Sequence, residues 1–122
     1  MGERLTKEGI GWRLGWNSHD SDYYGLLAGS SWAMELTKVE FYTFQKLAME
    51  VSSTMQAIAC ELMDDERITC EAEANHLWLE ADGFPEAYSI RFILKSGRRC
   101  EGEWDVEASQ QILQAIFQLV VF

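Results

Sequence analysis

The fold is decided by residues 68–81, ITCEAEANHLWLEA, in which small or apolar residues alternate with polar or charged ones on both sides of Asn75-His76. Alternation of this kind predicts two β-strands, each with one apolar face. A two-residue turn at Asn75-His76 opposes Ala74 to Leu77 and keeps both apolar rows on the same side. The stretch therefore predicts a β-hairpin with a polar outer face.

Negative charge is concentrated around this hairpin. Between Glu61 and Glu86 nine residues are acidic and only Arg67 is basic, and the whole chain has a formal charge of -10. The hairpin register places Glu71 opposite Glu80, a like-charge pair that costs stability unless something offsets it. Such charge repels polyanions, including nucleic acid, and favours basic partners or divalent cations.

A second hairpin is predicted directly after the first. Tyr88–Leu94 alternates in the same way, and a loop at 96–98 sets Leu94 against Cys100 and Arg91 against Glu103. Nearer the N-terminus, alternation and turn residues predict three more strands, at 10–16, 23–28 and 32–36.

Each group of strands precedes a predicted helix. Thr37 and Glu40 have the spacing of a capping box, and apolar residues at helical spacing follow from Phe41 onward. This pattern predicts a helix over 38–63. Asp105 is a suitable cap for a second helix that runs nearly to Phe122.

The expected fold is a single α+β domain over residues 1–122, with approximate halves 9–63 and 66–122. Its order is βββ-α-ββββ-α, that is, antiparallel sheets each followed by a helix. A chain of this length can enclose one main core. The tryptophans on apolar faces are expected to fill it: Trp12, Trp16, Trp32 and Trp104.

The composition indicates a cytoplasmic protein. Residues 1–10 lack the apolar centre of a secretory leader, and the longest apolar-looking stretch, 112–122, is far shorter than the roughly 20 residues of a membrane span. Cys60, Cys70 and Cys100 are odd in number and widely spaced, so they are expected to be reduced, buried thiols.

Several motifs resemble a small conserved cyanobacterial family of unknown function. They are Gly11-Trp12-Arg13-Leu14-Gly15-Trp16, Trp32-Ala33 with Glu35-Leu36-Thr37 and Glu40, Leu77-Trp78-Leu79-Glu80, and Glu101-Gly102-Glu103-Trp104. The resemblance implies a fold like that of the Whirly and positive-cofactor-four regulators, which bind single-stranded DNA. It implies no established activity.

One departure weakens a nucleic-acid function. Whirly proteins carry a Lys-Gly-Lys-Ala-Ala-Leu motif on a strand, and this chain lacks it. A single-strand binder needs a basic groove with exposed aromatic side chains. The acidic face confines any such contact to the edge between Lys95 and Arg99.

The outer face of the second group of strands favours a protein partner instead. Trp78 and Ile93 are expected to face outward among charged residues, as exposed apolar residues at interaction sites do. Alternatively, the edge of the first sheet, the N-terminal segment or a second copy of the chain covers them. The last case would make the protein a homo-oligomer.

Catalytic and metal sites are not expected. His19-Asp20-Ser21-Asp22 offers potential ligands but is typical of a solvated loop and lacks EF-hand spacing. His76 at a hairpin tip and Cys70 on a strand face would not converge easily. No nucleophile motif and no phosphate-binding glycine loop is present.

The sequence thus predicts a non-enzymatic protein-interaction or regulatory module without a cofactor. The alternative is a regulator that binds single-stranded nucleic acid. The candidate binding residues are Trp78, Ile93, Arg91, Lys95, Arg98 and Arg99.

Overall fold

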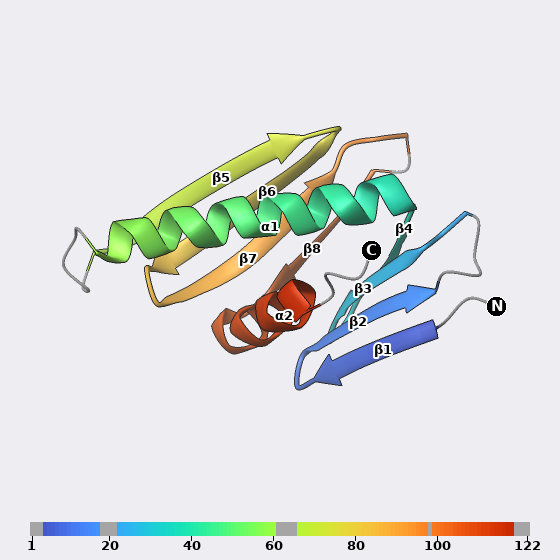
Figure 1. The fold of residues 1–122 in the computed structure, drawn as a ribbon, viewed down its shortest axis with the longest axis horizontal. Coiled ribbons are helices and arrows are strands. Elements are labelled where there is room, and N and C mark those ends of the chain that lie inside the picture. The colour runs from blue at the N-terminus through green and yellow to red at the C-terminus, as the bar shows by residue number, and fades with distance from the viewer. Residues whose placement is uncertain (1–3, 18–21, 61–65, 98, 119–122) are drawn as a thin grey trace.

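The structure is a computed structural model that describes residues 4–17, 22–60, 66–97 and 99–118. Its order is β1 (Arg4–Gly9), β2 (Trp12–Asn17), β3 (Gly25–Gly29), β4 (Ala33–Leu36), α1 (Lys38–Ala59), β5 (Ile68–Ala74), β6 (Leu77–Phe84), β7 (Ala87–Leu94), β8 (Cys100–Trp104) and α2 (Val106–Gln118). Two four-stranded antiparallel sheets, β1-β2-β3-β4 and β5-β6-β7-β8, each precede a helix, as Figure 1 shows. The α+β prediction is confirmed.

The first sheet has one strand more than predicted. β1 pairs with β2 in antiparallel register, with Leu5 opposite Trp16. Residues 4–9 are mostly polar and the strand lies at the sheet edge, so neither face of it shows an apolar row. Ile10, expected inside a strand, lies in the turn before β2 and is 92% exposed. The turn needs Gly11 at φ 83°, a region that glycine enters without a Cβ penalty.

The capping box at the start of α1 is confirmed. The Glu40 amide donates to Thr37 Oγ1 at 3.2 Å, and the Thr37 amide donates to Glu40 Oε1 at 2.9 Å. Leu36 and Phe41 are both buried beside it. α1 ends at Ala59. The predicted end at Met63 lies within 61–65, outside the described residues. The predicted end of the second helix near Phe122 also lies outside them.

The second sheet follows the predicted registers. Ala74 lies opposite Leu77, Glu71 opposite Glu80, and Arg91 opposite Glu103. Asn75 and His76 have φ values of 50° and 68°, the two positive angles of a type I′ turn, which matches the right-handed twist of the strands.

The helices lie on the inner faces of the strands. α1 crosses β5 and β6, and α2 packs against β7 and also contacts β1 and β2 of the first sheet (Figure 1). The resulting buried cluster draws residues from both sheets and both helices, among them Leu14, Phe44, Leu79, Phe92 and Ile112.

An aromatic group joins the two halves of the chain. Trp104 stacks on Phe92 with ring centroids 5.4 Å apart, and Trp32, from the turn between β3 and β4, lies 5.2 Å from Trp104. Trp104 Nε1 donates to the Ala28 carbonyl at 2.9 Å. Trp12 and Trp104 are buried as expected. Trp16 and Trp32 are only partly buried: Trp32 packs against the core cluster, and Trp16 lies beside Tyr24.

Gly102 provides the space for Trp32. A Cβ at this position would lie 2.6 Å from Cη2 of the Trp32 ring, and that ring is held by Phe92 and Trp104. We expect Gly102→Ala to lower the free energy of unfolding by about 1–3 kcal/mol, as overpacking does. Urea denaturation followed by tryptophan fluorescence measures the change.

Gly97→Ala is the matched control, since nothing lies within 4 Å of a Cβ at that exposed position. Equal denaturation midpoints for Gly102→Ala and Gly97→Ala would contradict the tight contact with Trp32.

Candidate interaction surface

The outer face of the second sheet carries most of the predicted binding residues. Trp78 on β6 lies directly opposite Ile93 on β7, and both side chains are partly buried. The predicted apolar pair among charged residues is therefore assembled on this face. We call the group formed by Trp78, Ile93, Arg91 and Glu71 the Trp78 surface, since Arg91 and Glu71 contact the Trp78 ring.

Charged side chains of the same sheet hold the Trp78 ring. The Arg91 guanidinium lies 5.0 Å from the ring centroid, within the range of a cation–π contact. Trp78 Nε1 donates to Glu71 Oε1 at 3.3 Å. Arg91 also lies 3.8 Å from Glu80 Oε1, so it neutralises one member of the Glu71–Glu80 pair. The like-charge pair predicted from the sequence is offset in this way.

One residue of the predicted basic edge, Lys95, is neutralised by an ion pair. Lys95 Nζ donates to Glu73 Oε2 at 2.8 Å, which joins the end of β7 to β5. Arg91 and Lys95 thus each have a carboxylate partner. Arg99 is exposed, and Arg98 lies outside the described residues.

Asp82 forms a further ion pair at the opposite end of β6. Arg67 donates to Asp82 Oδ2 at 2.7 Å and the Thr69 hydroxyl donates to Asp82 Oδ1 at 2.8 Å. The Thr69 hydrogen bond, followed by the Arg67 contacts, lowers the pKa of Asp82 below its ordinary value. Arg67, the only basic residue between Glu61 and Glu86, thus pairs with a strand residue of the second sheet.

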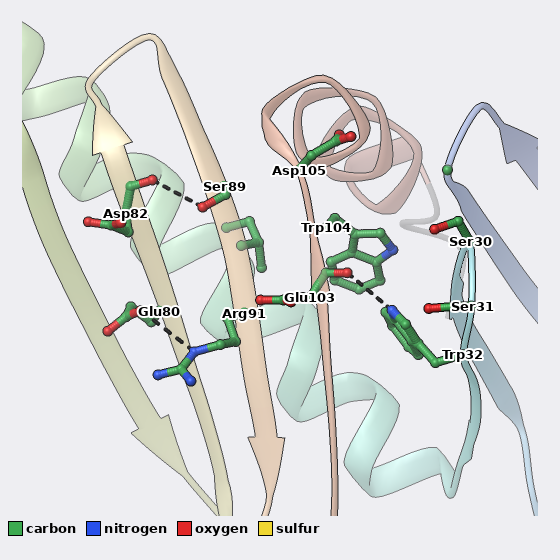
Figure 2. A pocket seen from close by; sticks show the side chains of 12 residues that line it. Ser30, Ser31, Trp32, Glu80, Asp82, Ser89, Arg91, Glu103, Trp104 and Asp105 are labelled. Atoms are coloured by element: carbon green, nitrogen blue, oxygen red, sulfur yellow. Dashed lines mark hydrogen bonds and ion pairs between the residues drawn. The ribbon is translucent and has the colours of Figure 1, made fainter.

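A hollow of about 630 Å³ adjoins the Trp78 surface and is drawn in Figure 2. One side is formed by Ser30, Ser31 and Trp32 from the turn between β3 and β4, and the other by strands of the second sheet. Trp32 Nε1 donates to the Glu103 carbonyl at 3.1 Å and links the two sides. The charged lining residues are Glu80, Asp82, Arg91, Glu103 and Asp105.

The lining of this hollow suits a cationic or polar group. Four of its five charged residues are acidic, and Asp82 and Glu80 already contact arginines. Asp105 Oδ1 accepts the Ala108 amide at 2.8 Å and so serves as the predicted helix cap. Glu103 is exposed.

Among residues 4–17, 22–60, 66–97 and 99–118, no three His, Cys, Asp or Glu side chains are grouped so that they could hold a metal ion. Most of the His19–Asp22 loop falls within residues 18–21, outside the described part of the chain. No described helix is both long and apolar enough to cross a bilayer.

The cysteines are less buried than expected. Cys60 is exposed, and Cys70 and Cys100 are partly buried in the edge strands β5 and β8.

The sequence did not predict that the turn between β3 and β4 lines the hollow. Ser30, Ser31 and Trp32 line the hollow, and Trp32 packs against Phe92 and Trp104 of the second sheet. Trp32 follows a Gly-Ser-Ser turn, and a large aromatic residue beside a turn is the feature that could have indicated a long-range contact.

The pKa of Asp82 gives a direct test of its hydrogen bonds. We expect Thr69→Val to raise this pKa toward the ordinary value of about 3.9, because the valine cannot donate to the carboxylate. A lowered folded pKa stabilises the protein at pH values above the unfolded pKa, and this contribution disappears as the pH falls through the folded pKa. Side-chain carboxyl shifts followed by NMR measure the titration.

Ser89→Ala is the control for this titration, since Ser89 donates to the backbone carbonyl of Asp82 and not to its carboxylate. The Asp82 pKa should stay low in this variant. A Thr69→Val protein that titrates like the wild type would refute the assignment to Thr69.

The architecture recurs in a solved structure. A crystal structure from Prochlorococcus sp. NATL2A, described as a protein with unknown function from the DUF155 family, is 28% identical to this chain. The match covers 96% of this chain and 98% of that chain, with a TM-score of 0.90. No match is found among curated proteins.

The family comparison covers nearly the whole sequence. The domain of unknown function DUF1818 matches residues 7–119, which include both sheets from within β1 onward and both helices. The chain therefore belongs to the DUF1818 family, a domain of unknown function.

Proposed function

We propose that the protein is a non-enzymatic, cytoplasmic interaction or regulatory module that binds a protein partner through the Trp78 surface. The observation that carries this proposal is the partly buried Trp78 ring, which lies beside Ile93 under the Arg91 guanidinium. An aromatic ring and an arginine inside a polar rim are typical anchors of protein interfaces.

The contacts around Trp78 favour a partner over a cover formed by the edge of the first sheet or by the N-terminal segment. The groups placed around Trp78 come from its own sheet: Glu71 from β5, and Arg91 and Ile93 from β7. They leave the ring partly accessible and held in one orientation. A partner that covers it would gain apolar contact without having to order the side chain first.

The charge of the protein indicates the kind of partner. The formal charge is -10, and the adjoining hollow has four acidic lining residues against one arginine. A partner with basic side chains near its contact residues would associate faster through electrostatic attraction.

Binding of single-stranded nucleic acid is the weaker alternative. It rests on the Whirly resemblance, which stays a prediction, and on the basic residues near Trp78. Arg91 and Lys95 are already paired with Glu80 and Glu73, so each would have to exchange a carboxylate for a phosphate. Bases stacked on Trp78 would also lie beside Glu71.

Replacing Trp78 tests the protein-partner proposal. In a pull-down from cyanobacterial lysate, Trp78→Ser should lose a partner that the wild type retains, and binding of that purified partner should weaken by at least about 2 kcal/mol, roughly 30-fold. The reason is that a hydroxymethyl group cannot replace the apolar contact of the indole ring.

Phe84→Ser is the control, because Phe84 is an exposed aromatic residue of the same strand β6, at the end far from Trp78. Its partners should match those of the wild type. Identical partners for Trp78→Ser would count against this surface. A monomer–dimer equilibrium in sedimentation that Trp78→Ser abolishes would identify a second copy as the partner.

A titration with labelled oligothymidine at low salt separates the nucleic-acid alternative. We expect no change in fluorescence anisotropy, because the acidic residues repel the phosphates most strongly at low ionic strength. A salt-sensitive increase that is lost in Lys95→Ala and Arg99→Ala would instead support the alternative.

A further inference from the structure

We infer that the open edge of β5 accepts an extended, basic segment of a partner protein as an added antiparallel strand. This inference concerns the edge of the second sheet; it shares Glu71 with the Trp78 surface but does not rest on the proposed function. The register, the exposure and the charge of β5 each contribute to it.

β5 is the longest edge strand in the described structure. It has seven residues and pairs with β6 on one side only (Figure 1). The opposite edge of the same sheet, β8, is approached by Trp32, which donates to the Glu103 carbonyl. In the first sheet the edge strands are β4, with four residues, and β1, which α2 contacts. The edge of β5 is therefore the one best suited to strand addition.

The hairpin register identifies the backbone groups that point away from β6. In a two-residue hairpin the residues that flank the turn form a hydrogen-bonded pair, so Ala74 bonds Leu77 and every second residue of β5 does the same. The Lys95 amide donates to the His76 carbonyl, which agrees with this alternation on the other side of β6. The outward N–H and C=O groups thus belong to Thr69, Glu71 and Glu73.

Exposure along β5 fits a strand with no second strand beside it in the described part of the chain. The inward-facing residues Ile68, Cys70, Ala72 and Ala74 are all only partly buried. Their partners one strand further in, Leu77, Leu79 and Ala81, are completely buried. An added strand would extend the sheet under α1 and cover the inner side of Cys70 and Ala72.

Charge selects the occupant. A residue that exchanges backbone hydrogen bonds with Glu71 or Glu73 has its side chain beside that carboxylate, because directly opposed residues share a face. Glu71 and Glu73 each use one carboxylate oxygen, toward Trp78 and Lys95. A second copy of β5 would bring further glutamates to this row, which is unfavourable. A strand with lysine or arginine at every second position and small apolar residues between them is complementary.

A seven-residue peptide of alternating valine and lysine, blocked at both ends, is a suitable probe. NMR hydrogen exchange of the full chain should show at least tenfold slower exchange of the Thr69, Glu71 and Glu73 amides when the peptide is present. The Cys70 and Ala72 amides, already bonded to β6, should change much less. Protection elsewhere, or no protection, would overturn the inference.

A peptide in which proline replaces the central lysine, with one lysine added at an end to keep the charge, is the control for simple electrostatic attraction. The proline lacks the N–H that would face β5, so this peptide should not protect the outward amides. Equal binding of both peptides would refute strand addition. Protection of the same amides by raising the protein concentration without peptide would show that a second copy is the occupant, which also refutes it.

Charge reversal gives a second test. The double variant Glu71→Lys, Glu73→Lys should lose at least tenfold in affinity for the lysine peptide and gain affinity for the corresponding valine–glutamate peptide. Glu8→Lys is the matched control, because Glu8 is an exposed glutamate in the edge strand of the other sheet. Trp78→Ser should keep peptide binding, so that failure at the edge and failure at the Trp78 surface remain distinguishable.

Discussion

The environment of Trp104 is the interaction on which the rest of the structure depends. Its indole N–H donates to the Ala28 carbonyl of the first sheet, while its ring stacks on Phe92 and touches Phe44 of α1. A buried indole needs a hydrogen-bond partner, and here that partner belongs to the other half of the chain. The same side chain thus fills the core and fixes one sheet against the other.

The outer face of the second sheet shows how a strongly acidic sequence becomes a stable surface. Arg91, Lys95 and Arg67 each contact a different carboxylate, namely those of Glu80, Glu73 and Asp82. Exposed ion pairs contribute little each, about 0–1 kcal/mol, so their main effect is to position the side chains around Trp78. The acidity of the hairpin is therefore an organised pattern of contacts.

Local features were predictable from the sequence. The capping box of Thr37 and Glu40, the turn at Asn75-His76 and the strand registers that follow all depend on neighbours close in the chain. β1 was not predicted, because a polar edge strand is held by backbone hydrogen bonds and shows no alternation of apolar residues. The candidate surface was predicted for Trp78 and Ile93, which lie on adjacent strands. The wall that Trp32 forms in the hollow was not predicted, because it depends on a contact with Glu103, which lies 71 residues further along the chain.

Trp32 has a consequence for the hollow beside the Trp78 surface. The hollow takes one wall from the turn between β3 and β4 and the other from β6, β7 and β8, so hinge motion between the sheets would change its width. Trp32 restricts that motion, since its ring is wedged over Gly102 and its N–H is bonded to β8. The hollow is thereby pre-organised, and a ligand that enters it gives up little conformational entropy of the protein.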